Sequence, residues 1–86
     1  PPSARYLDLF RAACAQNEAR MAADCRQLAA NIAARHTRAR VTDVDLTTWR
    51  GRRVYEVDLD GRRGDYEVIV DARSGRILSS KFDPDD

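Results

Sequence analysis

Residues 54–78 read VYEVDLDGRRGDYEVIVDARSGRIL, and the alternation of apolar and polar side chains in this stretch decides the fold. Apolar residues recur at every second position on both sides of the central DGRRGD, which is the period of a β-strand with one buried face. The side chains that would share this face are Tyr55, Val57 and Leu59 before the turn and Tyr66, Val68 and Val70 after it. Gly61, Gly64 and Gly75 mark tight turns, so the connections are short and the paired strands must be antiparallel.

The same two-residue period continues on either side of this stretch. It predicts four strands rich in Val, Ile, Tyr and Thr, at residues 41–48, 53–60, 66–71 and 76–82. We therefore expect an antiparallel meander over residues 40–82, followed by a frayed acidic tail at residues 83–86.

The N-terminal part of the chain has a different period. Residues 4–36 contain no Gly or Pro, and helix-forming residues dominate there. Apolar side chains recur three and four residues apart in two stripes, one made of Leu7, Phe10 and Cys14 and the other of Met21, Cys25, Leu28 and Ile32. Polar Gln16 and Asn17 interrupt the pattern, so this segment is either one long helix or a pair of helices.

These periods predict an α+β fold, with an N-terminal helix or helical pair packed on a four-stranded antiparallel sheet, in a single domain of 86 residues. A continuous helix over residues 4–36 would be about 50 Å long, whereas a strand of about seven residues spans only about 23 Å. The sheet therefore cannot bury both stripes of a straight helix. Leu7, Phe10 and Cys14 must either fold back as part of a second helix or contact another chain.

The two cysteines, Cys14 and Cys25, leave two alternatives open. On an uninterrupted helix they would lie about 16 Å apart along the axis, whereas a disulfide needs Cα atoms within about 7 Å. A helical hairpin that breaks near Asn17 would bring them together, and such a staple suits a small domain in an oxidising compartment. Otherwise they are two buried thiols that pack as small apolar side chains.

Charge is unevenly distributed along the chain. Residues 1–40 hold seven Arg against three acids, whereas residues 41–86 hold eight cations against eleven acids. Halves of opposite charge favour packing within the chain or self-association at least as readily as nucleic-acid binding. Acids also interleave with the Arg residues that follow Trp49, so we expect cross-strand ion pairs and no nucleic-acid partner.

The sequence contains no pattern that indicates a catalytic activity. It contains no recognisable nucleophile–base pair, metal cluster or phosphate-binding loop, and His36 is the single histidine. The acids at residues 58–65 depart from the EF-hand pattern, because the glycine comes too early and no terminal Glu follows. We therefore expect a protein that is not an enzyme, with no catalytic residue, no cofactor and no bound metal.

The order of these elements resembles the PepSY family, a group of small bacterial domains. The motifs that carry the resemblance are, in chain order, AANIA at 29–33, YEV at 55–57, YEVIVD at 66–71, and Gly75 with Leu78. Together they cover roughly residues 22–82. The resemblance carries over no catalytic residue, because the signature residues look structural: Tyr55, Val57, Tyr66, Val68, Asp71 and Gly75.

What the resemblance implies is a non-catalytic exported module that holds or inhibits a peptidase or acts as a binding domain of the cell envelope. The protein would then be secreted, periplasmic or associated with the cell wall. The chain begins at Pro1 without a methionine, so we expect a mature region from which a signal peptide has been removed. No apolar run approaches the about 20 residues needed to span a membrane.

The leading hypothesis is therefore a protein-binding module that regulates or inhibits a peptidase. Its partner surface would be the stripe of Leu7 and Phe10, Trp49, or a sheet edge that accepts an added strand. Trp49 could equally cap the open end of the core. The alternative is a self-associating structural domain that forms a homodimer, and a nucleic-acid-binding domain is the third hypothesis.

Overall fold

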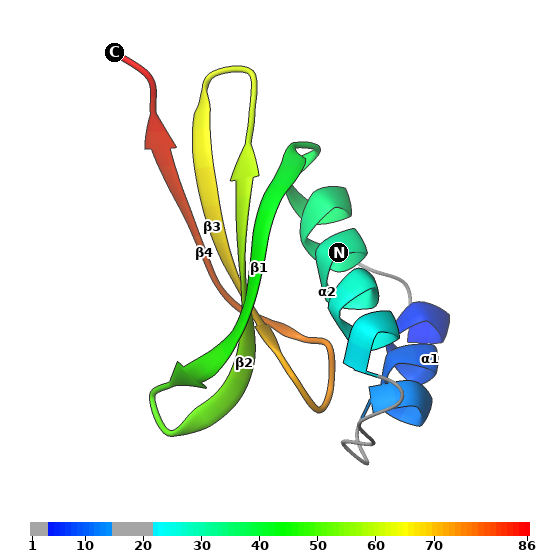
Figure 1. The fold of residues 1–86 in the computed structure, drawn as a ribbon. Coiled ribbons are helices and arrows are strands. Elements are labelled where there is room, and N and C mark those ends of the chain that lie inside the picture. The colour runs from blue at the N-terminus through cyan, green and yellow to red at the C-terminus, as the bar shows by residue number, and fades with distance from the viewer. Residues whose placement is uncertain (1–3, 15–21) are drawn as a thin grey trace.

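Two helices and four strands make up the part of the chain that the structure describes (Figure 1). The structure is a computed structural model, and it describes residues 4–14 and 22–86. Its elements, in chain order, are α1 (Ala4–Cys14), α2 (Ala22–Thr37), β1 (Arg40–Trp49), β2 (Arg52–Asp60), β3 (Gly64–Asp71) and β4 (Ile77–Pro84). The predicted α+β fold is therefore confirmed.

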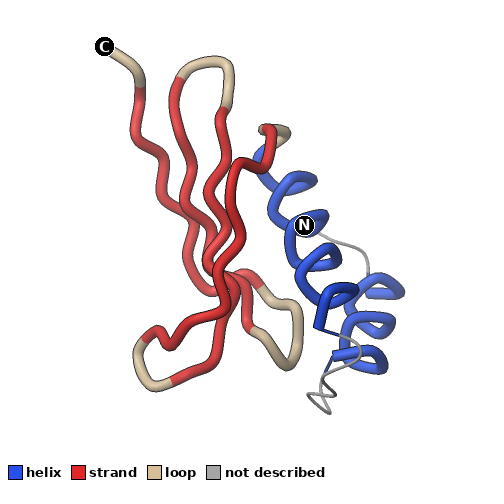
Figure 2. Tube along the Cα trace, viewed as in Figure 1, coloured by secondary structure: helices blue, strands red, loops and turns tan. Residues whose placement is uncertain are grey.

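The four strands form one antiparallel sheet in the order β1-β2-β3-β4, as the predicted meander requires. The sheet is strongly twisted, and its strands cross in the middle of the view (Figure 2). Arg50 and Gly51 form the turn between β1 and β2, with positive φ angles of 50° and 78°. A two-residue turn of this kind matches the strand twist and fixes the register, which places Val57 between Val44 and Val68.

The last strand is longer than the sequence predicts. β4 continues to Pro84, whereas the sequence predicts a frayed tail over residues 83–86. Pro84 lies opposite Gly64, and the Asp85 N–H donates to the Arg63 carbonyl at 2.8 Å. Proline is tolerated here because β4 is an edge strand, where every second N–H points away from the sheet. The strand therefore takes up the first two residues of the predicted tail.

The N-terminal segment contains two helices that lie side by side (Figure 1). The break predicted near Gln16 and Asn17 lies outside the described residues. α2 ends at Thr37 because Arg38 adopts a positive φ of 57°, and its N–H donates to the Ala34 carbonyl at 2.7 Å. Neither described helix combines the length and the apolar character that a membrane crossing requires.

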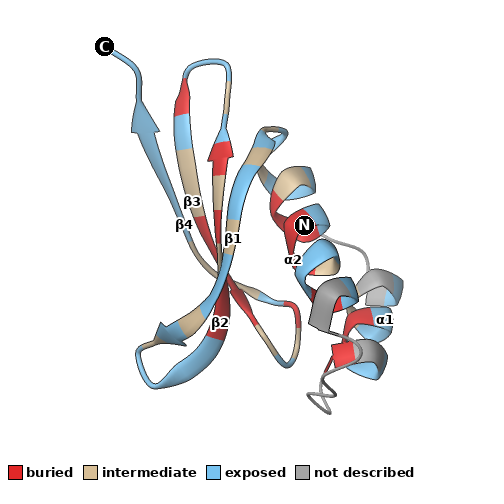
Figure 3. Cartoon of the chain, viewed as in Figure 1, coloured by how far each residue is buried: buried red, intermediate tan, exposed pale blue. Residues whose placement is uncertain are grey.

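The core lies between the helices and one face of the sheet, where the buried segments face each other in Figure 3. Ile32 of α2, Val57 and Val68 are completely buried there. Ala29 and Ala33 are completely buried as well, and their small side chains let α2 approach the sheet closely. Each fully buried Ile or Val side chain stabilises the fold by roughly 1.5–3 kcal/mol relative to an exposed one.

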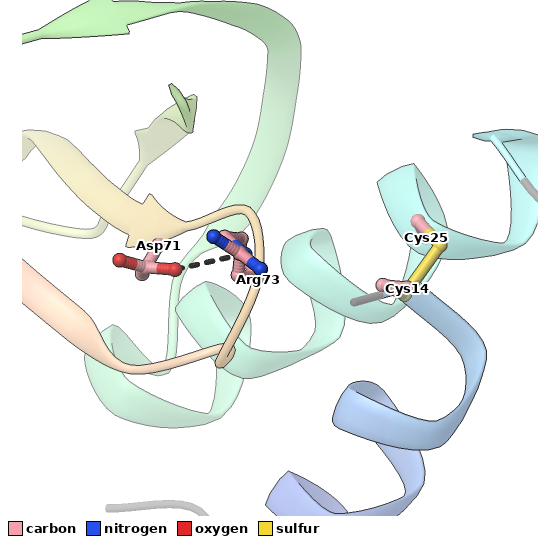
Figure 4. The surroundings of a disulfide bond; sticks show 4 residues. All are labelled: Cys14, Cys25, Asp71 and Arg73. Carbon is pink, nitrogen blue, oxygen red and sulfur yellow. Dashed lines mark hydrogen bonds between the residues drawn. A yellow bond between two sulfur atoms is a disulfide. The ribbon is translucent and has the colours of Figure 1, made fainter. Parts of the chain in front are cut away.

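A disulfide bond joins Cys14, the last residue of α1, to Cys25 in α2 (Figure 4). The two Cα atoms lie 5.7 Å apart, within the range that a disulfide spans. Of the two alternatives that the sequence leaves open, the structure therefore contains the bridge. It closes a loop of 11 residues and ties α1 to the helix that covers the sheet.

Replacing Cys14 and Cys25 together by serine should lower the free energy of unfolding by about 3 kcal/mol, because the unfolded chain regains the freedom that the closed loop denies it. Urea denaturation of the wild type and the variant measures the difference. Reductant should weaken the wild type by a similar amount and leave the variant unchanged. Identical unfolding midpoints for oxidised and reduced wild type would contradict the stabilising role of the bridge.

Candidate functional site

The turn between β3 and β4 is built around Asp71. This residue is only 3% exposed, and its carboxylate accepts a hydrogen bond from the backbone N–H of Arg73 at 2.7 Å, which Figure 4 draws, and another from the backbone N–H of Ser74 at 3.0 Å. Its backbone carbonyl accepts the Gly75 N–H at 2.9 Å. The Asp71 carboxylate therefore supplies the hydrogen-bond acceptor for two backbone N–H groups of the turn and holds the turn in one conformation.

Arg52, on the neighbouring strand β2, is the charged partner of this buried carboxylate. Its guanidinium donates to the second carboxylate oxygen of Asp71 at 2.6 Å. Burial raises the pKa of Asp71, but the hydrogen bonds from Arg73, Ser74 and Arg52 lower it by more, so the net pKa lies below its ordinary value. The sequence predicts cross-strand ion pairs for the Arg residues that follow Trp49, and Arg52 makes one, but the sequence does not identify its partner, because residues 19 apart meet only once the strands have paired.

Gly75 brings the same turn into contact with both helices. Its φ is +76°, a conformation that residues with a side chain rarely adopt. A Cβ atom at this position would come within 2.8 Å of the Phe10 ring and 3.2 Å of the Ile32 side chain. The glycine thus serves both the backbone conformation and the close contact, and the role of the turn is structural.

The partner surface predicted on the N-terminal stripe is largely buried. Phe10 is completely buried, Cys14 is bridged, and Leu7 is half-buried. The prediction that Phe10 contacts a partner is therefore wrong, because α1 folds back and buries the ring within its own chain. Leu9, which lies outside the stripe, is 55% exposed.

Trp49 is the last residue of β1, and this end of the strand lies well away from α1 in Figure 1. It is half-buried, and the guanidinium of Arg50 lies 4.5 Å from the centroid of its ring, in cation–π contact. The structure therefore does not combine Trp49 and Leu7 into one surface. Each remains a separate candidate for contact with a partner.

The face of the sheet turned away from the helices carries facing carboxylates. Cross-strand pairing places Asp58 between Asp43 and Glu67, and it places Glu56 opposite Asp45. The sequence predicts ion pairs between acids and Arg residues here, and for this group the prediction is wrong. The register of the strands decides which charges meet, and it aligns acids with acids.

Three of these acids, Asp45, Glu56 and Asp58, have a raised pKa. Burial and then the charge of Glu67 raise the pKa of both Glu56 and Asp58. A hydrogen bond with Asp43 raises the pKa of Asp45. Oxygen atoms of Glu56, Asp58 and Glu67 lie within 4.8 Å of one another and could each offer a ligand to a cation. Ca²⁺ takes about six to eight oxygen ligands, however, so we assign no ion to this cluster.

A groove with a volume of about 550 Å³ lies between α2 and the edge strand β1. Its helix side is lined by Arg26, Gln27, Ala30 and Asn31, and its strand side by residues 41–44. The Arg26 guanidinium reaches across the groove and donates to the Val44 carbonyl at 2.5 Å. The groove therefore joins exposed helix side chains to the backbone of an open sheet edge.

Sequence reasoning identifies a sheet edge as a candidate surface but misses both the groove and Arg26. An exposed Arg on a helix is common, and its acceptor here is a backbone carbonyl, which every residue possesses. The pairing of α2 with β1 rather than β4 decides where the groove forms. No residue pattern in the sequence specifies that choice.

The groove and the Asp71 turn lie inside the part of the chain that matches a known family. The PepSY family model, described as peptidase propeptide and YPEB domain, matches residues 26–81. These residues include most of α2 and nearly the whole sheet, whereas α1 and both cysteines lie outside them. The chain matches no curated protein and no solved structure.

Substitution Gly75→Ala should lower the free energy of unfolding by about 2–4 kcal/mol, because it combines backbone strain with overlap against Phe10. Gly51→Ala is the matched control, since Gly51 has a similar φ of +78° but no atom within 4 Å of an added Cβ. The control should lose only about 1–2 kcal/mol. Urea denaturation measures both values, and equal losses would contradict the packing role of Gly75.

Substitution Asp58→Asn should raise the free energy of unfolding at neutral pH by up to about 1 kcal/mol, because it removes one charge from facing acids. The pKa of Asp58 in the folded state lies above its ordinary 3.8, so the wild type gains stability as the pH falls through that range. The advantage of the variant should therefore shrink toward about pH 4.

Asp8→Asn on α1 is the control for the Asp58 substitution, because the Asp8 carboxylate lies 4.0 Å from the Arg11 guanidinium rather than from other acids. It should not stabilise the protein at any pH. Urea denaturation at several pH values measures both variants. A loss of stability in Asp58→Asn at neutral pH would show that the carboxylate makes a favourable contact instead.

Proposed function

We propose, on the premise that this chain belongs to the PepSY family of peptidase propeptide and YPEB domains, that it is an exported, non-catalytic module that binds a peptidase and restrains it. The observation that carries the proposal is the extent of the match, which covers residues 26–81. These residues form a complete unit of helix on sheet with its own core. The chain is thus a peptidase-propeptide-like module, whereas its export, its lack of catalysis, and the binding and restraint of a peptidase are the proposed parts.

The disulfide supports an exported location independently of the family match. Cys14 and Cys25 both lie outside the matched residues, yet they are bridged. Disulfides form and persist in oxidising compartments such as the periplasm or the extracellular space. A secreted, periplasmic or cell-wall-associated protein would therefore keep this staple.

The contacts of the buried carboxylate of Asp71 support a binding role for the protein rather than a catalytic one. Among the residues that the structure describes, Asp71 is the one charged residue that is buried. Its carboxylate accepts hydrogen bonds from Arg52, Arg73 and Ser74. A carboxylate held by three donors and kept ionised serves the turn. A partner would instead meet open surfaces, namely the groove, Trp49 or the acidic face.

The alternative of a homodimer loses one of the two observations on which it depended, the exposed stripe, and keeps only the opposite charges of the two halves of the chain. It required the stripe of Leu7, Phe10 and Cys14 to seek another chain, and α1 now places that stripe against its own domain. The binding of a peptidase does not require this stripe to contact another chain. We therefore retain a protein partner of a different kind as the proposal.

The test is an activity assay of peptidases exported by the same organism, with and without the oxidised chain at about micromolar concentration. Cleavage of a protein substrate should slow in proportion to the chain added, and the two proteins should co-elute in size-exclusion chromatography. The mass of the chain should stay intact, which distinguishes restraint from competition by another substrate. Unchanged rates and separate elution across these peptidases would contradict the proposal.

A further inference from the structure

The hydrogen-bonding pattern of the sheet determines which backbone groups of β1 point outward. In an antiparallel sheet, successive residues turn both N–H and C=O first toward one neighbouring strand and then toward the other. The Ala72 N–H donates to the Arg53 carbonyl at 3.0 Å, so the odd-numbered residues of β2 bond toward β3. The β1 residues opposite them therefore point away from the sheet: Val44, Leu46 and Thr48.

Arg26 provides independent evidence for this orientation. Its guanidinium, which lies outside the sheet, donates to the Val44 carbonyl. That carbonyl must therefore point toward the groove and not toward β2. Leu46 and Thr48 follow at intervals of two and share its orientation, so the edge offers N–H and C=O groups along this part of β1.

The two edge strands of the sheet, β1 and β4, differ in how strongly they discourage the addition of another strand. β4 carries Lys81 and ends at Pro84, and both residue types discourage the addition of another strand. β1 runs for 10 residues and contains neither Lys nor Pro. It also leaves Leu46 40% exposed beside the open backbone groups. β1 is therefore the edge that is better suited to pairing.

The side chains that flank this edge define the chemistry of an added strand. Asp43 and Asp45 lie on the outer face of β1, next to further acids on β2. Their position favours basic side chains on the outer face of the added strand, because opposite charges on neighbouring strands attract. On the other face, Ala30, Val41 and half-buried Val44 form the apolar part of a groove whose other lining residues are polar, and this part favours apolar side chains.

A second copy of this chain fits the same edge poorly. In antiparallel pairing of two β1 strands, a register centred on Val44 would place Asp43 of one copy opposite Asp45 of the other, and a register centred on Leu46 would place the two Asp45 residues diagonally across from each other. The shared sheet would also carry the acids of both copies on one face, including Glu56 and Asp58. Such like-charge contacts oppose self-association and favour a different, basic partner.

We infer that β1 between Val44 and Thr48, with the groove beside α2, binds an extended segment of a partner protein in which basic and apolar side chains alternate. This inference deepens the proposed function and depends on it only for the existence of a partner. The added strand pairs with the open backbone groups, its basic side chains face Asp43 and Asp45, and its apolar side chains enter the groove. An N–H group of the added strand replaces the Arg26 guanidinium at the Val44 carbonyl.

The test measures binding of a short capped peptide of alternating lysine and valine to the full chain, by fluorescence anisotropy. Leu46→Pro removes an outward N–H and should weaken binding by about tenfold or more. Ser80→Pro is the matched control, since Ser80 lies opposite Val68 at the other edge and its N–H also points outward. It should change the affinity less than about twofold. A peptide with glutamate in place of lysine should not bind.

Arg26→Ala should tighten binding by about two- to tenfold, because it removes the internal competitor for the Val44 carbonyl. Replacing Asp43 and Asp45 together by asparagine should weaken it. These two variants decide the matter if Leu46→Pro fails to fold by circular dichroism, and unchanged affinity in both overturns the inference. The absence of peptide binding overturns it too, as does equal binding by Leu46→Pro and Ser80→Pro.

The failure of this inference is distinguishable from the failure of the proposed function. The peptide experiment contains no peptidase, so its outcome does not depend on which peptidase is the partner. A peptidase that is restrained equally by the wild type and by a folded Leu46→Pro variant would leave the proposed function standing and remove the β1 edge as its site.

Discussion

The contact between the turn at Gly75 and the two helices is the constraint on which the rest of the structure depends. There a backbone without a side chain, at φ +76°, admits the Phe10 ring from α1 and the Ile32 side chain from α2. The turn keeps the required shape because Asp71 satisfies its amides, and Arg52 balances the buried charge. The disulfide between α1 and α2 belongs to the same buried cluster as Phe10 and Ile32, and it limits how far α1 can move from this contact.

A single alternation of side chains produces the two unlike faces of the sheet. The face toward the helices is apolar and supplies the core, where burial provides the main stabilisation. The opposite face aligns Asp58 with Asp43 and Glu67, an arrangement that opposes folding at neutral pH because like charges face each other. The fold tolerates it because these carboxyl groups keep contact with water, and because the raised pKa of Asp58 lets this residue take up a proton more readily than a free carboxyl group. The acidic face is thus a consequence of register and contributes nothing to holding the domain together.

The features that the sequence predicts correctly are those that local periodicity determines. The two-residue period located all four strands, and the short turns fixed their antiparallel order. The errors concern contacts between segments. The burial of Phe10 depended on how α1 folds back, and the meeting of Asp58 with other acids depended on the register between strands. The groove and Arg26 were missed for the same reason, since a helix side chain found a backbone group on a strand that is distant in sequence.

The contacts that stabilise the domain and the edge assigned to a partner lie on different sides of α2. In Figure 1 this helix lies between β1 and α1, so the disulfide and the Phe10 contact lie on one side and the open edge of β1 on the other. An added strand would extend the sheet at β1 without displacing any core residue, because only Arg26 occupies that edge among the described contacts. The family match follows the same division, since it includes the edge and the groove but excludes α1 and its bridge. The added helix can therefore strengthen the domain without covering the edge assigned to a partner.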